Sequence, residues 1–214
     1  MEQLRSSLRD KPAARWGALA LISLTMFFAY MFVDVLSPVK ILVEQELGWD
    51  STVFGLYGGS EFFLNVFVGF LIFAGIILDK MGVRFTALLS GSLMVLGAVL
   101  KVYALSETFR NGGVGYEAIS SLTGGIKSVF GWELPPTALL ACLGFMIFGC
   151  GTEMAGVTVS RAIVKWFKGK EMALAMGIEM ALARFGVFTI FRISPWLSEK
   201  FETVQAPVIF CALL

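Results

Sequence analysis

The sequence Gly75-Ile-Ile-Leu-Asp79-Lys80-Met-Gly82-Val-Arg84 separates two apolar runs, each long enough to cross a lipid bilayer. Such a short connection between two membrane spans is a tight, charged hairpin. Gly82 tolerates the unusual backbone angles that this turn requires. Asp79 follows the end of one span, and Lys80 and Arg84 lead into the next. The stretch therefore predicts an all-α membrane protein.

The composition points to the same class of protein. Hydrophobic residues make up 57% of the chain and charged residues 15%, and the mean hydropathy is +0.80. These values exclude an ordinary soluble domain and imply that the bilayer surrounds the chain. The net charge of +1 gives no indication of a nucleic-acid partner. Histidine is absent and no catalytic cluster is visible, so we expect no metal, no cofactor and no enzymatic activity.

Apolar runs of sufficient length define five predicted membrane helices, followed by one that is cut off. Their ranges are 16–39, 52–78, 83–105, 136–164 and 173–193, with the incomplete helix at 206–214. Residues 1–15 form the predicted N-terminal tail, and 16–214 form one bundle. Pro38 and Pro195 are expected to end the first and fifth helices. The connection 106–135 either contains a short amphipathic helix at 116–130 on the outer surface or lacks defined structure.

Basic residues are unevenly distributed between the two ends of the predicted helices. The richer side includes the N-terminal tail: Arg5, Arg9, Lys11, Arg15, Lys80, Arg84, Arg161, Lys165, Lys168 and Lys170. The poorer side contains Lys40, Lys101, Arg110, Lys127, Arg192 and Lys200. The positive-inside rule then predicts a cytoplasmic N-terminus.

Ionisable side chains inside a span are costly, so each calls for a role. The predicted spans contain Asp34, Glu61, Glu153, Glu179 and Arg184. At about 1.5 Å per residue, Glu153 and Arg184 lie about 18 and 20 Å above the basic link that joins their helices, near the bilayer midplane. They either form a buried ion pair or share a substrate, with Glu153 binding an ammonium group and Arg184 a carboxylate.

Asp34 and Glu61 are predicted at a second level, about 28 Å from the same side. Tyr30 and Tyr57 precede them by one helical turn and share their faces. The two carboxylates are either solvated in an outer vestibule or act as proton sites or ammonium contacts. The two tyrosines either line the same region or pack in the core. Glu179 points about 140° away from Arg184 and is interpreted as a structural partner of cytoplasmic-side polar groups.

The spacing of Gly75, Asp79, Lys80, Gly82 and Arg84 resembles the loop signature between the second and third helices of the major facilitator superfamily. Phe85 stands where that family usually has another basic residue. The resemblance implies the N-terminal six-helix bundle of a secondary transporter, which works with a second bundle around a central solute site. It also implies that Asp79 and Arg84 fasten a cytoplasmic gate. The missing C-terminal six-helix bundle means either that the sequence is a fragment or that a second chain completes the molecule.

A narrower resemblance rests on three stretches: Gly151-Thr-Glu153-Met, Lys165-Trp-Phe-Lys-Gly-Lys-Glu171 and Ala183-Arg184-Phe-Gly186. They resemble the branch that contains the animal lysosomal dipeptide transporters, which implies that Glu153 holds the amino end and Arg184 the carboxyl end of a peptide. The alternatives are a transporter of the same fold for another organic ion or sugar, and a non-transporting scaffold or accessory subunit. The outer loops lack N-x-S/T sites and the N-terminus lacks an acidic dileucine signal, so a bacterial inner membrane is favoured over a lysosomal membrane.

Overall fold

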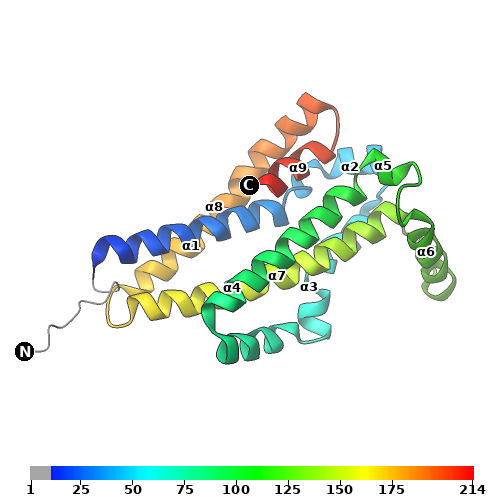
Figure 1. Ribbon diagram of the computed structural model, residues 1–214. Coiled ribbons are helices and arrows are strands. Elements are labelled where there is room, and N and C mark those ends of the chain that lie inside the picture. Colours follow the sequence, from blue (N-terminus) through cyan, green and yellow to red (C-terminus); the bar gives the residue numbers. More distant parts are fainter. Residues whose placement is uncertain (1–10) are drawn as a thin grey trace, which may run out of the picture.

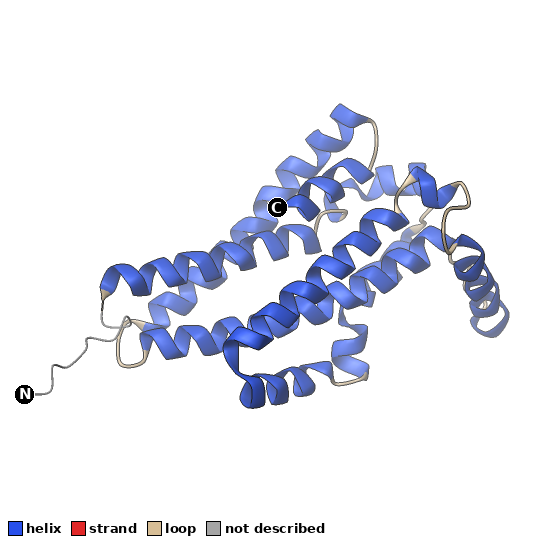
Figure 2. Cartoon of the chain, in the orientation of Figure 1, coloured by secondary structure: helices blue, strands red, loops and turns tan. Residues whose placement is uncertain are grey.

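A computed structural model describes residues 11–214, and helices account for most of this range (Figures 1 and 2). No strand occurs among these residues, which confirms the predicted all-α fold. Four helical stretches in the described range are long and apolar enough to cross a membrane: Pro12–Leu47, Phe70–Ala104, Pro136–Phe167 and Met172–Phe201. Arg5 and Arg9, which contributed to the predicted orientation, lie outside the described residues.

The first span ends earlier than the sequence suggested. Helix α1 (Pro12–Val33) begins with proline at its first position, where the missing N–H costs nothing. It ends at Val33 rather than at residue 39. The chain then turns and continues as the short helices η2 (Ser37–Val39) and α2 (Lys40–Leu47). Asp34 therefore caps the end of α1 instead of lying inside the helix.

The predicted second helix, 52–78, is interrupted in the structure. Helix α3 (Ser51–Phe67) starts at Asp50, whose carboxylate accepts a 2.7 Å hydrogen bond from the Val53 N–H. It stops before Gly69, which adopts a left-handed φ of 69°. Helix α4 (Phe70–Ala104) follows and contains one non-helical residue, Gly82, with φ 78° and ψ 170°. The chain changes direction there, as Figure 1 shows, so the turn is much tighter than the predicted hairpin.

One of the remaining helices lies in the connection 106–135, for which the sequence allowed either a short helix or no defined structure. After α5 (Glu107–Arg110), the connection folds into α6 (Tyr116–Phe130), and α7 (Pro136–Phe167) comes next. Of the two alternatives for this connection, the structure therefore contains the short helix at 116–130. The last helices are α8 (Met172–Phe201) and α9 (Gln205–Leu213).

Pro195 does not end its helix, in contrast to the prediction. Helix α8 continues through it to Phe201. Proline removes a single backbone N–H, and long membrane helices tolerate this where neighbouring groups satisfy the polar atoms. Next to it, the Ser194 hydroxyl donates a 2.6 Å hydrogen bond to the Val35 carbonyl just beyond α1. This contact fastens α8 to the end of the first span.

Close helix contacts organise the bundle. Helices α3 and α4 pack along α7, and α8 packs along α1 (Figure 1). At the α4–α7 contact, a Cβ atom on Gly97 would lie 2.5 Å from the Gly144 carbonyl oxygen, and one on Gly144 would lie 2.9 Å from that of Gly97. Backbones can approach this closely only where side chains are absent, which is how helices commonly associate in lipid.

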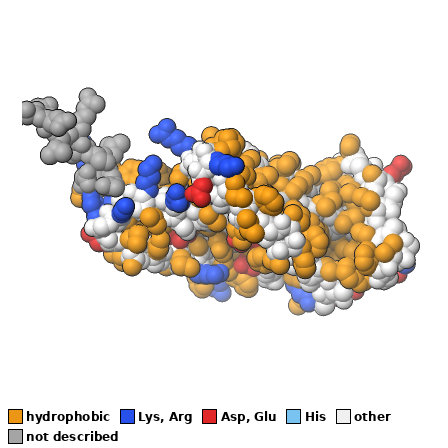
Figure 3. All heavy atoms as spheres, turned by 90° about the horizontal axis from the view of Figure 1, so that it is seen from below, with side chains coloured by type: hydrophobic (Ala, Val, Ile, Leu, Met, Phe, Trp, Pro, Cys, Tyr) orange, Lys and Arg blue, Asp and Glu red, His pale blue; other side chains and the backbone are white. Residues whose placement is uncertain are grey.

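The outer surface of the bundle is apolar. Figure 3 shows hydrophobic side chains over most of one face, with charged side chains more frequent toward the N-terminal end. Ile72, Leu88 and Val95 are 70%, 74% and 65% exposed. A water-soluble domain rarely exposes so many large apolar side chains, so this surface is that of a membrane protein. An apolar groove of about 630 Å³ lies between α1 and α4, and the end of α9 lines it.

Candidate functional site

Tyr30, near the end of α1, lies within electrostatic range of four of the charged residues predicted within the spans. The charges of Arg184, Glu153, Glu61 and Glu179 all lie close enough to interact electrostatically with its phenol. Its helix is well placed for this role because α1 contacts both α7 and α8. Charged residues of α3, α7 and α8 therefore lie within electrostatic range of one tyrosine of α1, and Arg184 is the one that contacts its ring.

Arg184 of α8 lies against this tyrosine. Its guanidinium carbon is 5.4 Å from the centre of the Tyr30 ring, a cation–π arrangement. The two helices approach closely because Gly186, on α8, has no side chain: a Cβ there would collide with the Phe27 carbonyl oxygen of α1. The Arg184 side chain is exposed and forms no ion pair with any residue in the described range.

Glu153 lies half-buried on α7, among glycines. Gly149 and Gly151 abut α3 and α4, where an added Cβ would collide, whereas Gly156 faces open space. Among residues 11–214, Glu153 and Arg184 do not form an ion pair with each other or with another side chain. The buried-pair interpretation is therefore not supported, and both charges are available. The helices that carry the two residues, α7 and α8, both contact α1, and Arg184 lies against Tyr30 of that helix.

Glu179 lies nearer to this cluster than its position in the sequence suggested. Its place five residues before Arg184 predicted a role apart from the site. In the structure its carboxylate is half-buried and interacts electrostatically with Tyr30. Helical periodicity predicts that Glu179 and Arg184 lie on different faces of α8. A charge on one face can still act on a side chain of a neighbouring helix that packs near the other face.

A second cluster lies deeper in the bundle and centres on Lys101 of α4. The Lys101 side chain is fully buried, and Nζ donates a 3.3 Å hydrogen bond to the Phe32 carbonyl. Three aromatic rings surround the ammonium group: those of Phe32, Phe145 and Tyr57, with centres 4.4, 4.5 and 5.2 Å away. An ammonium enclosed by aromatic faces is stabilised by their negative potential.

Glu61 of α3 is the main negative charge near this lysine. It is only 5% exposed and interacts electrostatically with Lys101, Glu153 and Asp34. The expectation of a solvated carboxylate in an outer vestibule is therefore wrong for Glu61. Asp34, at the end of α1, is half-buried and accepts a 3.1 Å hydrogen bond from the Ser37 hydroxyl.

Tyr57 packs in the core instead of lining an open region. Its ring is 3% exposed and stacks on Phe145, with centres 4.8 Å apart and planes 13° from parallel. Its hydroxyl is buried and has no hydrogen-bond partner within the described range. Through its ring, Tyr57 contributes to the environment of Lys101 rather than to that of Arg184.

Sequence reasoning missed the role of Lys101, which it counted only among the basic residues on the poorer side of the membrane. One signal was present. Gly97, Lys101 and Ala104 recur at helical spacing, and all three are buried. A lysine aligned with small residues on one helical face points toward a neighbouring helix instead of toward water.

The predicted gating motif lies toward the other end of α4. The Asp79 carboxylate forms a 3.2 Å ion pair with Arg161 of α7, and both side chains are largely exposed. Gly75 lies within a helical segment, whereas Gly82 forms the turn. Lys80 and Arg84 are exposed and form no ion pair among residues 11–214. At this same end, Arg15 is bonded to Glu171 at 3.1 Å.

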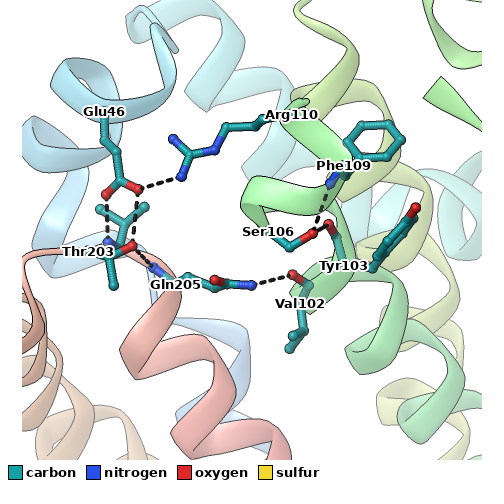
Figure 4. Close-up of polar contacts among 9 residues, drawn as sticks. Glu46, Val102, Tyr103, Ser106, Phe109, Arg110, Thr203 and Gln205 are labelled. Atoms are coloured by element: carbon teal, nitrogen blue, oxygen red, sulfur yellow. Dashed lines mark hydrogen bonds and ion pairs between the residues drawn. The ribbon is translucent and has the colours of Figure 1, made fainter. Parts of the chain in front are cut away.

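A polar network closes the opposite end of the bundle (Figure 4). The Glu46 carboxylate accepts hydrogen bonds from Arg110, the Thr203 hydroxyl and the Val204 N–H, at 3.2, 3.0 and 2.8 Å. The Gln205 side chain donates to the Val102 carbonyl at 3.1 Å. These bonds tie α2 and α5 to the connection between α8 and α9. Within the described residues, no group of three His, Cys, Asp or Glu side chains is arranged to hold a metal.

Comparison with known proteins identifies the family. The family model for the Major Facilitator Superfamily matches residues 22–214. Similar curated proteins include the lysosomal dipeptide transporter MFSD1 of Bos taurus, 28% identical over 191 residues, and that of Homo sapiens, 27% identical over 193 residues. These alignments cover 89% and 90% of this chain.

The chain spans about a third of the length of these relatives, 34% and 35% respectively. No solved structure matches it. The family model nevertheless covers nearly the whole chain, and the described helices include four stretches able to cross a membrane. This chain is therefore an integral membrane protein that belongs to the Major Facilitator Superfamily.

Proposed function

We propose that this chain is the N-terminal bundle of a secondary transporter for small zwitterionic solutes, with dipeptides as the first candidates. The observation that carries the proposal is the placement of Glu153 and Arg184. They bear opposite charges on helices that both contact α1, Arg184 lies against Tyr30 of that helix, and neither residue forms an ion pair in the described range. Unpaired charges of opposite sign inside a membrane protein suit a solute that carries both signs.

Each charged residue has a distinct role in this proposal. Arg184 presents two N–H groups to a solute carboxylate, a geometry that lysine cannot reproduce. Glu153 accepts the solute ammonium. Glu61 is the weaker candidate for the ammonium because the buried Lys101 already balances its charge. Asp34 and Glu61 are the proposed sites if protons accompany the solute.

Transport requires more than this chain. We propose that a second six-helix bundle, in the same protein or in a partner, completes the site and alternates access to it. Asp79 and Arg84 would then fasten the cytoplasmic gate. The Asp79–Arg161 ion pair already links two helices at that end and would exchange during gating. No covalent chemistry is needed, so the proposed protein is not an enzyme.

The proposed location is a bacterial inner membrane with the N-terminus in the cytoplasm. The relatives bear the name of lysosomal transporters, which keeps a lysosomal membrane as the alternative. A transporter of the same fold for another organic ion or sugar is the second candidate function, because an arginine on a tyrosine face also suits an anion. A non-transporting scaffold is the third.

The decisive experiment measures dipeptide uptake into vesicles that contain the complete protein of which this chain is part. Arg184→Ala should reduce uptake of a free dipeptide by at least about 10-fold, because a charge-assisted hydrogen bond is worth about 1.5–3 kcal/mol. Uptake by Arg184→Lys should remain close to that of Arg184→Ala, because lysine cannot offer the same pair of N–H groups to a carboxylate. The matched control is Arg192→Ala, which removes an exposed arginine of the same helix and should leave uptake intact.

A second set of uptake measurements separates the role of Arg184 from that of Glu153. A dipeptide whose carboxyl end is amidated should be a poor substrate for the unmodified protein and should be affected little by Arg184→Ala. Glu153→Gln should instead impair solutes that carry an ammonium group. Full uptake by Arg184→Ala would reject the proposed site, and the absence of any dipeptide binding by the complete protein would favour another solute.

A further inference from the structure

Helix α6 has an exposed apolar stripe that the bundle does not cover. One edge of the helix packs on the bundle: Thr123 is buried, and Tyr116 and Ile119 pack against the core. The adjacent stripe is open, with Leu122 56% exposed and Val129 72% exposed. At about 100° per residue, these two side chains point in nearly the same direction.

The opposite side of α6 is polar. Glu117, Ser121 and Ser128 lie more than about 90° from Leu122 on the helical wheel. All three are exposed. The helix therefore separates an apolar stripe from a polar one although it forms no part of the candidate solute site. A helix whose apolar and polar faces are separated in this way suits a boundary between lipid and water.

The position of α6 places it at such a boundary. Figure 1 shows it at the end of the bundle where α7 begins, remote from the connection between α7 and α8. Residues 131–135 join it to Pro136, the first residue of a span. This link reaches at most about 20 Å when fully extended, so α6 stays close to the level at which α7 enters the membrane.

The link is held even closer by its own contacts. Lys127 of α6 forms a 2.6 Å ion pair with Glu133. Both side chains are largely exposed, and the hydrogen bond and charge of Lys127 lower the pKa of Glu133, so this part of the link is charged and suits contact with water. Phe130 and Trp132 stack at 5.5 Å and are 63% and 49% exposed. Exposed aromatic rings beside a span are typical of the membrane interface.

We propose that α6 lies in the interfacial layer of the bilayer, with Leu122, Val129 and Phe130 against the lipid and Glu117, Ser121 and Ser128 in water. The bilayer is the occupant because it already surrounds the adjoining span and because the link cannot carry α6 away from it. α6 has one acidic and one basic residue, Glu117 and Lys127, so apolar burial rather than attraction to anionic headgroups provides the binding. The helix then fixes the depth at which α7 sits.

Spin labels test this arrangement in the complete protein. Cys142, Cys150 and Cys211 are replaced by alanine, and single cysteines are introduced as Leu122→Cys and, as the matched control, Ser121→Cys. In phosphatidylcholine vesicles, the label at position 122 should collide several-fold more with oxygen, which concentrates in lipid, than with a water-soluble nickel chelate. The label at position 121 should show the reverse.

Each other outcome contradicts the proposal. Equal access of the nickel chelate to both labels would place α6 in water. Exclusion of both reagents from position 122 would show that protein, such as a second copy of the chain, covers the stripe. If the cysteine-free background fails to fold, the otherwise unmodified chain still gives an answer. Brominated lipids should quench its tryptophan emission more than that of Trp132→Phe, and equal quenching would overturn the proposal.

Discussion

At the scale of single residues, Lys101 carries a charge that is expensive to bury. Its ammonium group has one carbonyl acceptor at 3.3 Å and three aromatic faces, and no carboxylate in the described range lies within ion-pair distance. Glu61 supplies the compensating charge from farther away. Burying either charge alone would cost several kcal/mol, so the two residues depend on each other.

A double-mutant cycle measures this dependence. Lys101→Met preserves the length of the side chain but leaves Glu61 without its cation, and should lower the free energy of unfolding by about 1–3 kcal/mol. Adding Glu61→Gln removes the unbalanced charge and should restore part of the loss, with a coupling of about 0.5–3 kcal/mol. Thermal unfolding in detergent provides the measurement.

Lys127→Met serves as the control for this cycle. It removes an exposed lysine and should change the free energy of unfolding by less than about 0.5 kcal/mol. Strict additivity of Lys101→Met and Glu61→Gln would show that the two charges do not interact.

At the scale of helices, the crossing of α3 and α7 is set by a missing side chain. A Cβ atom on Gly149 would collide with the Glu61 carbonyl oxygen and would lie 2.8 Å from its Cγ. The crossing holds Glu61 at the buried contact and leaves Glu153, one turn further along α7, half-exposed. Helix packing thus assigns two carboxylates, both predicted inside spans, to different environments.

Substitution of glycine by alanine at two positions of α7 tests this packing. Gly149→Ala should force the helices apart and lower the free energy of unfolding by about 1–3 kcal/mol. Gly156→Ala meets nothing within 4 Å and should be neutral or stabilising by up to about 1 kcal/mol, because alanine favours the helix. Similar thermal unfolding of both variants would contradict the close crossing.

At the scale of the whole molecule, the bundle has two different ends. One carries the Arg15–Glu171 and Asp79–Arg161 ion pairs, and the other carries the Glu46 network and α6. The full length of α7 separates them. Because α7 is long and apolar enough to cross a membrane, we expect these ends to face opposite compartments.

Labelling of single cysteines in intact cells tests this arrangement. Glu117→Cys and Lys168→Cys place exposed thiols before and after α7. A membrane-impermeant maleimide should react with only one of them, and with a cytoplasmic N-terminus that one is Glu117→Cys. The native cysteines are buried and should contribute little background. Reaction of both positions would show that α7 does not span the membrane, and reaction of Lys168→Cys alone would reverse the proposed orientation.

The class of fold and the presence of long membrane helices were predictable from the sequence, because bilayer thickness sets the length of an apolar run and lipid penalises every charge within it. The helix at 116–130 could also be proposed from the sequence, because amphipathic periodicity is a property of the local sequence. Which helix packs on which neighbour is not local. Only the tertiary structure showed that α1, not α7, supports Arg184, and that Lys101 is enclosed by aromatic rings. The passage of α8 through Pro195, beside the Ser194–Val35 hydrogen bond that joins it to the end of α1, was likewise visible only in the tertiary structure.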